Sequence, residues 1–282
     1  MARKNYQYRS GGLLLTAVVA LLAFGAAVDV VLIPLNLWEV SIYERAESPD
    51  VAQDFALQAD ADSMSVAVGA AAILAVLIFL VTAICFLCLT YRAGANAHTL
   101  APRVQYAAGW AVGWYFVPFL NLVRPYQAMA EYFRASRPRS EGGVPEHWQD
   151  NRVPGLLRVW WGLWLLGGVL GQVSARMAMQ EPGVGDFSMA KTACYLSIGE
   201  SLIGVASAAT AIWMFRTLFH WQSERRQEKR SEPDVGEGRD LAATCRECGE
   251  ALPVGADEPV ADPDRCPMCG AEHPARRDEA LV

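Results

Sequence analysis

Residues 109–127 of this 282-residue chain read GWAVGWYFVPFLNLVRPYQ, and the way this stretch meets a membrane decides the fold. With residues 104–108 in front of it, the stretch gives about twenty nearly uncharged residues, enough for one helix to cross a bilayer. It also contains Pro118, Asn121 and Pro125, and Arg124 lies near its end. Whether it crosses fixes the side of the membrane on which every later residue lies.

Four other segments are long and apolar enough to cross a bilayer. They are residues 13–37, 66–89, 156–175 and 193–219. The first follows a short basic arm, residues 1–12, as the apolar part of a signal peptide would. Its apolar run is too long for that and has no clear cleavage site, so we interpret it as an uncleaved span.

The distribution of basic residues distinguishes four spans from five, because cytoplasmic loops carry an excess of Arg and Lys. The arm has three basic residues and no acid, whereas residues 38–65 contain one Arg and seven acids. Residues 90–152 contain seven Arg, and residues 225–230, just after the last span, contain four more basic residues. With four spans, every strongly basic region and both termini lie in the cytoplasm. With five, two of these regions would lie outside, so the sequence predicts four.

The segment 104–134 is then predicted to enter the membrane from the cytoplasmic side, or to lie at its interface, without crossing it. Pro118 lacks a backbone N–H and disturbs the helical turn before it. Gly109 and Gly113 are expected to allow close packing against another helix. After the second proline, apolar residues recur at helical spacing, which predicts an amphipathic helix on the membrane surface. The alternative is an ordinary proline-kinked span.

Three groups of residues carry a resemblance to a known family. They are YRAGANA at 91–97, GWAVGWYFVPFLNLVRPY at 109–126, and the pair Trp160 and Trp161. This pattern resembles the bacterial membrane proteins grouped as domain of unknown function 4328, over residues 10–225. The resemblance implies a four-helix domain in a bacterial inner membrane, and it implies no established activity.

The strongest chemical signal is a pair of CxxCG motifs in the tail, separated by seventeen residues. Four thiolates at this spacing can close a tetrahedral Zn²⁺ site, and four protein ligands leave no open position for a substrate. The sequence therefore predicts a structural zinc ion and a reducing compartment. A redox dithiol pair and a ribbon that no longer binds metal are the alternatives. The predicted ligands are Cys245, Cys248, Cys266 and Cys269.

The composition of the tail bears on its partners. Residues 236–282 contain eleven acids and five Arg. Because nucleic-acid affinity depends heavily on neutralising phosphates, this balance disfavours nucleic acid and favours a protein partner. Residues 222–241 are charged without an apolar pattern, so we expect the end of the fourth helix to run into a linker there, with the zinc ribbon over 242–282.

Two acids lie inside predicted spans, where a charged side chain is costly and marks a functional candidate. Asp29 and Glu200 would lie at a similar depth, roughly 10–12 Å from the outer surface by helix rise. Arg176, at the outer end of the third span, is expected to reach either carboxylate. Such a group would bind a proton or a cation, or would only hold the helices together.

A second polar group is predicted on the cytoplasmic side. Arg92 and Asn96 share a helix face because they are four residues apart. If the segment 104–134 folds back against the second span, Asn121 and Arg124 join them. The four would bind an anion or a lipid headgroup, or would satisfy the broken backbone around Pro118.

The sequence thus predicts an all-α integral membrane protein. It has a four-helix membrane domain over 13–221, a re-entrant or interfacial segment, and a C-terminal zinc ribbon. No Ser–His–Asp set, HExxH, phosphate loop or dinucleotide motif is found, which disfavours an enzyme. We expect a scaffold or sensor that contacts membrane lipid and presents the ribbon to a protein. The alternatives are a small transporter or channel using Asp29 and Glu200, and a membrane enzyme acting on lipid.

Overall fold

The computed structural model describes residues 6–47, 55–179 and 187–231. The chain divides into two units, Met1–Lys229 and Arg230–Val282, and the structure described below is that of the first. The zinc ribbon predicted over 242–282 lies outside the described residues, and so do its four cysteines.

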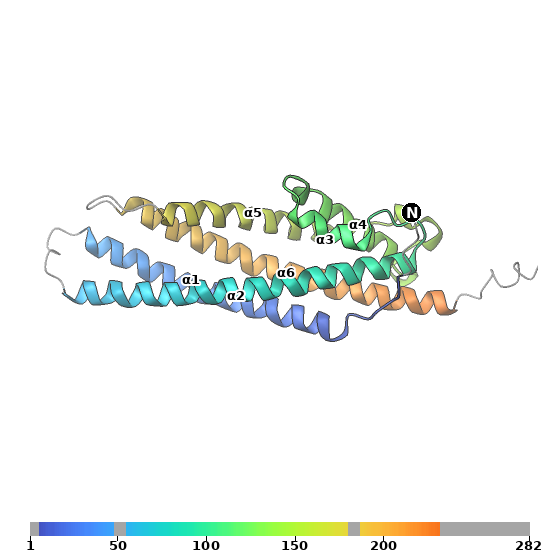
Figure 1. Cartoon of the computed structure of the whole chain (residues 1–282), viewed down its shortest axis with the longest axis horizontal. Coiled ribbons are helices and arrows are strands. Elements are labelled where there is room, and N and C mark those ends of the chain that lie inside the picture. The colour runs from blue at the N-terminus through green and yellow to red at the C-terminus, as the bar shows by residue number, and fades with distance from the viewer. Residues whose placement is uncertain (1–5, 48–54, 180–186, 232–282) are drawn as a thin grey trace, which may run out of the picture. The chain divides into compact units, whose positions relative to one another are not determined.

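All regular structure in the described residues is helical. The long helices are α1 (Gly12–Ala46), α2 (Phe55–Leu100), α5 (Gly155–Ala178) and α6 (Ser188–Ser231), and the shorter ones are α3 (Ala108–Gly113), η1 (Trp114–Phe116), η2 (Leu120–Leu122), α4 (Arg124–Ser136), η3 (Arg139–Glu141) and η4 (Pro145–Asp150) (Figure 1). Each long helix contains one predicted span and continues beyond it. Four helices are long and apolar enough to cross a membrane, which confirms the predicted all-α architecture with four spans.

The buried core lies at one end of these helices and not along their whole length. In the predicted spans, large apolar side chains such as Ile73 and Phe79 are 66% exposed, as suits contact with lipid. Near the ends of two spans, Leu89 and Phe215 are instead fully buried where the end of α2 meets α4 and α6, and so is Phe133 of α4. Lipid tails are as apolar as these side chains, so the hydrophobic effect does not drive packing along the lipid-facing parts of the spans. At about 1.5 Å per residue, α2 and α6 each exceed twice the ~30 Å hydrocarbon thickness.

The stretch 109–127 does not form a membrane-crossing helix. It divides into α3, η1, η2 and the start of α4, and α3 has only six residues, about 9 Å of rise. The backbone breaks after Pro118, where Phe119 has a φ of 62°. The alternative of a single proline-kinked span is therefore wrong.

The predicted close packing at Gly109 and Gly113 is also wrong. A Cβ added to Gly109 would meet open space, and one added to Gly113 would meet only the Trp110 ring of the same segment. The segment is instead attached through aromatic contacts. Tyr115 packs edge-on against Phe86 of α2, with ring centroids 6.0 Å apart.

Helix α4 is amphipathic as predicted, but its apolar face does not lie on a membrane surface. Nine of its thirteen residues are buried, among them Met129, Tyr132 and Phe133, which have no exposed surface. They pack into the core with the ends of α2 and α6. Helical periodicity identifies an apolar face, but a bilayer and a protein core both cover such a face equally well.

The fourth long helix continues well past its predicted end. Residues 222–231, where the end of the fourth helix is expected to run into a charged linker, form the last turns of α6. Gln222 is fully buried and Arg225 is 6% exposed. The predicted helix end therefore reaches Ser231, and Gln222 and Arg225 pack against other parts of the protein.

Candidate functional site

The N-terminal arm, residues 6–11, is held by the end of α2. The side chain of Asn96, which has no exposed surface, accepts the Arg9 N–H at 2.9 Å and donates to the Arg9 carbonyl at 2.8 Å. The Nη1 of Arg92 donates to the carbonyls of Ser10 at 3.0 Å and Gly11 at 3.3 Å. Two residues predicted to hold a headgroup therefore bind the backbone of the arm.

Gln222 of α6 extends these contacts into a polar network that joins the arm, α2, α4 and α6. Its Oε1 accepts from Asn96 Nδ2 at 2.8 Å. Its Nε2 donates to the Ala93 carbonyl at 3.0 Å and to Ser136 Oγ at 3.2 Å. The side chains of Asn96, Ser136 and Gln222 are all fully buried. Sequence patterns did not identify Gln222, because it lies in a polar run that resembles a solvated helix end.

The outer part of the arm contacts the same helices. The Tyr6 ring stacks on His98 of α2 with centroids 4.8 Å apart. The Arg226 guanidinium lies 4.1 Å from the centre of the Tyr8 ring. The arm and the last turns of α6 therefore lie at the same end of the helices, as an even number of spans requires.

Asn121 and Arg124 do not join Arg92 and Asn96, so the predicted convergence of the four residues is wrong. Arg124 Nη1 donates to the hydroxyl of Tyr106 at 3.1 Å and to Gln127 Oε1 at 3.3 Å. Asn121 lies in η2 and is partly buried. The break after Pro118 starts α4 at Arg124, which directs that side chain to the residues before α3.

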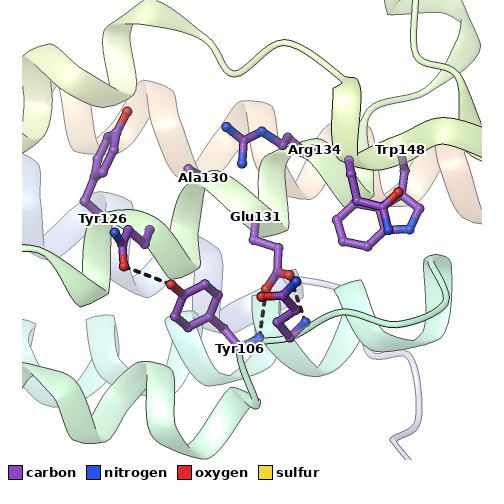
Figure 2. Close-up of a pocket in the computed structure, with 9 residues that line it drawn as sticks. Tyr106, Tyr126, Ala130, Glu131, Arg134 and Trp148 are labelled. Carbon is purple, nitrogen blue, oxygen red and sulfur yellow. Dashed lines mark hydrogen bonds between the residues drawn. The ribbon is translucent and has the colours of Figure 1, made fainter.

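A first cavity, of about 440 Å³, lies between α4 and the residues before α3. Figure 2 shows Tyr106, Tyr126, Glu131, Arg134 and Trp148 around it. The Glu131 carboxylate accepts the backbone N–H groups of Gln105 and Tyr106, each at 2.8 Å. Glu131 thus fixes the connection between α2 and α3.

Tyr132 supports the same connection from the buried side of α4. Its hydroxyl donates to the Tyr106 carbonyl at 3.0 Å. Burial, and then the neighbouring Glu131 carboxylate, raise the pKa of Tyr132 above its ordinary value. The phenol therefore keeps the proton that this hydrogen bond requires.

A second cavity, of about 670 Å³ and called here the arm cavity, lies between the arm, α2 and α3. Arg9, Arg92 and Asn96 line its polar part, and Leu14 and Leu87 belong to its apolar part. The remaining lining residues are Tyr6, Gln7, Cys88, Tyr91, Ala95, Gly109 and Val112.

The structure brings Asp29 and Glu200 together across two spans. The Asp29 carboxylate on α1 lies against Gly204 of α6, so closely that a Cβ at Gly204 would clash with it. Gly204 is one helical turn after Glu200, whose carboxylate fills the corresponding space at Gly171 of α5.

Arg176 does not take part in this arrangement. It is exposed near the end of α5, and among the described residues it forms no ion pair with either carboxylate. Within residues 6–47, 55–179 and 187–231, no three His, Cys, Asp or Glu side chains are placed to hold a metal ion. The predicted zinc ligands Cys245, Cys248, Cys266 and Cys269 lie outside that part.

Comparison with known proteins identifies the family. The model of the family described as Domain of unknown function (DUF4328) matches residues 51–219. The match covers more than half of the chain, which therefore belongs to this family, and the first span lies outside the match. No curated protein and no solved structure matches the chain. With its four candidate spans, the chain is a membrane protein of this family.

Proposed function

We propose that this member of the DUF4328 family is a non-enzymatic scaffold or sensor of a bacterial inner membrane, whose helices hold a zinc ribbon in the cytoplasm for a protein partner. One observation carries the proposal. Helix α6 runs from its span to Ser231, and Gln222 joins its last turns to α2 and α4 by hydrogen bonds. The tail therefore starts from a fixed base and not from a free chain end.

The use of the buried polar side chains supports a role other than catalysis. Asn96 and Glu131 each bind backbone groups with both polar atoms of the side chain. Gln222 binds Asn96, Ser136 and a helix carbonyl. Buried polar groups satisfied in this way fix the relative positions of the segments they join.

The cytoplasmic orientation rests on charge and on chemistry. The basic regions fall on the side of the arm and of the end of α6. A site of four thiolates persists in a reducing compartment, whereas an oxidising one favours disulfides. The proposed ligands of the structural Zn²⁺ are Cys245, Cys248, Cys266 and Cys269.

Zinc content and partner capture test this proposal. The full chain is purified in detergent, and its zinc is measured beside a Cys245→Ser, Cys266→Ser variant and a Cys85→Ser, Cys194→Ser control. We expect about one zinc ion per chain, lost only in the first variant. In cross-linked cells, the proteins captured by the chain should depend on the same two cysteines. An unchanged set of captured proteins in the zinc-free variant would refute the scaffold role.

A second candidate function rests on the juxtaposition of Asp29 and Glu200. Two carboxylates that share a site repel each other and bind a proton or a cation in compensation. A proton- or cation-coupled transporter would use this pair, and liposomes containing the chain and a pH-sensitive dye test it. We expect flux that Asp29→Asn with Glu200→Gln abolishes and that Glu141→Gln, outside the spans, leaves unchanged. Liposomes without flux in the parent chain would exclude this function.

A further inference from the structure

We propose that the arm cavity binds one phospholipid with an anionic headgroup. The phosphate would lie at Arg9 and Arg92, and an acyl chain would lie among the apolar residues of α1, α2 and α3. This inference goes beyond the scaffold role and does not depend on the zinc ribbon.

The polar part of the cavity has the chemistry of an anion site. An Arg side chain carries five N–H donors, and only the Nη1 of Arg92 is used, for the Ser10 and Gly11 carbonyls. Among the described residues, no acceptor is assigned to its Nε and Nη2 groups. Arg9 is exposed beside it, and no Asp or Glu lines the cavity. Two Arg without a facing carboxylate favour a phosphate, because Arg and phosphate match in charge and in hydrogen-bond geometry.

The opposite part of the cavity is apolar. Leu14, Leu87 and Val112 line it, together with the thiol-bearing Cys88, which is exposed. Gly109 also lines it, and a Cβ at that position would meet open space. A free phosphate ion would gain nothing from contact with these apolar residues. The volume of about 670 Å³ is that of a site for a drug-sized ligand. The combination therefore fits an amphiphile.

The cavity also lies at the right depth for a membrane lipid. Leu14 is the second residue of the first predicted span, and Leu87 and Cys88 are near the end of the second. Arg9 and Arg92 lie just outside the same two spans. Trp110, next to Gly109, is 60% exposed, and Trp is enriched at the level of the headgroups. The cavity thus crosses the boundary between headgroups and acyl chains.

Asn96 connects the cavity to the rest of the structure. It lines the cavity, and its side chain binds both the arm and Gln222 of α6. A lipid in the cavity would touch the residues that fix the arm. The proposed lipid site therefore shares Asn96 with the polar network that holds the arm.

Lipid binding to the full chain in detergent, measured by native mass spectrometry, tests the proposal. The probes are phosphatidylglycerol and phosphatidylcholine with the same acyl chains. Both lipids carry the phosphate, but the choline ammonium would lie beside two Arg that repel it, so phosphatidylglycerol should bind at least about tenfold more tightly. Arg9→Gln with Arg92→Gln should remove this preference, whereas Arg158→Gln with Arg176→Gln, two exposed residues of α5, should keep it.

A steric variant keeps the test valid if the loss of Arg92 loosens the arm. Gly109→Leu fills the apolar part without touching either Arg and should weaken both lipids about tenfold or more. Gly162→Leu is the matched control, because a Cβ there also meets open space, on α5 and away from the cavity. Unchanged binding to Gly109→Leu would overturn the proposal. So would a preserved preference in the double Arg variant, or competition by soluble glycerol phosphate as strong as that by the lipid.

Discussion

Replacing Asn96 by Ala should release the N-terminal arm. Asn96 holds Arg9 by two backbone hydrogen bonds of 2.9 and 2.8 Å. Each such bond contributes a net 0.5–1.5 kcal/mol, so their loss shifts the equilibrium between bound and released arm by about 1–3 kcal/mol. At 1.4 kcal/mol per factor of ten, the population with a released arm rises about 5- to 150-fold.

Trypsin measures this population, because it cleaves after Arg9 only when the arm is released. If the arm rebinds faster than it is cut, the cleavage rate follows the released fraction. The product that begins at Ser10 is quantified over time by mass spectrometry. We expect this product to appear about 5- to 150-fold faster from Asn96→Ala than from the wild type, with the helical circular dichroism signal unchanged.

Two further variants separate the hydrogen bonds from simple volume loss. Asn96→Asp keeps the size of the side chain but removes the donor to the Arg9 carbonyl and to Gln222 Oε1, so it should release the arm at least as strongly. Asn36→Ala removes an amide that donates only to the Leu32 carbonyl of its own helix, and should leave cleavage unchanged. Cleavage of Asn96→Ala at the wild-type rate, or equal acceleration by Asn36→Ala, would refute the reasoning.

Three other predictions follow from contacts elsewhere. Gly204→Ala should lower the free energy of unfolding in detergent by about 1–3 kcal/mol, because the added Cβ meets the Asp29 carboxylate. Gly199→Ala should leave this free energy unchanged, because a Cβ there meets open space. Adding Asp29→Ala to Gly204→Ala should restore most of the lost stability. Trp161→Phe removes the Nε1–H donor to the Leu122 carbonyl at 3.1 Å, and should speed amide exchange in residues 119–123 by about 2- to 10-fold, measured by mass spectrometry; equal exchange would contradict this contact. Burial raises the pKa of Tyr132, so the contribution of its protonated hydroxyl to the stability of the fold is complete below about pH 10 and is lost as the pH rises further. In Tyr132→Phe, the unfolding temperature should therefore fall less steeply with pH in the alkaline range.

The predicted spans were confirmed because a membrane-crossing helix is specified locally. All its backbone hydrogen bonds lie within the segment, and its length is set by the thickness of the bilayer. The same local logic identified the break at Pro118 and the amphipathic period of α4. Local reasoning failed to predict what covers α4, because the apolar face of a helix does not indicate whether lipid or protein packs against it.

The candidate sites divide in the same way. The sequence identified Asp29 and Glu200, since a charge in an apolar run is conspicuous, and the structure placed both beside glycines of neighbouring helices. Arg92 and Asn96 were also identified, although their main partner is the arm. Glu131 was missed, because an acid in an amphipathic helix resembles a solvated residue until the two N–H groups that it accepts are known.

The sequence alone therefore determined the family, the helical class and the four spans of this protein, because these depend on local composition and periodicity. Only the tertiary structure decided how its polar residues are used. Asn96 and Gln222 are 126 residues apart in the chain, yet they form one hydrogen bond of 2.8 Å in the core. Spacing along a sequence predicts which side chains share a helix face, but a bond between helices also depends on their relative depth and rotation. Those are fixed by packing at one end of the helices, where α2, α4 and α6 bury their side chains against one another.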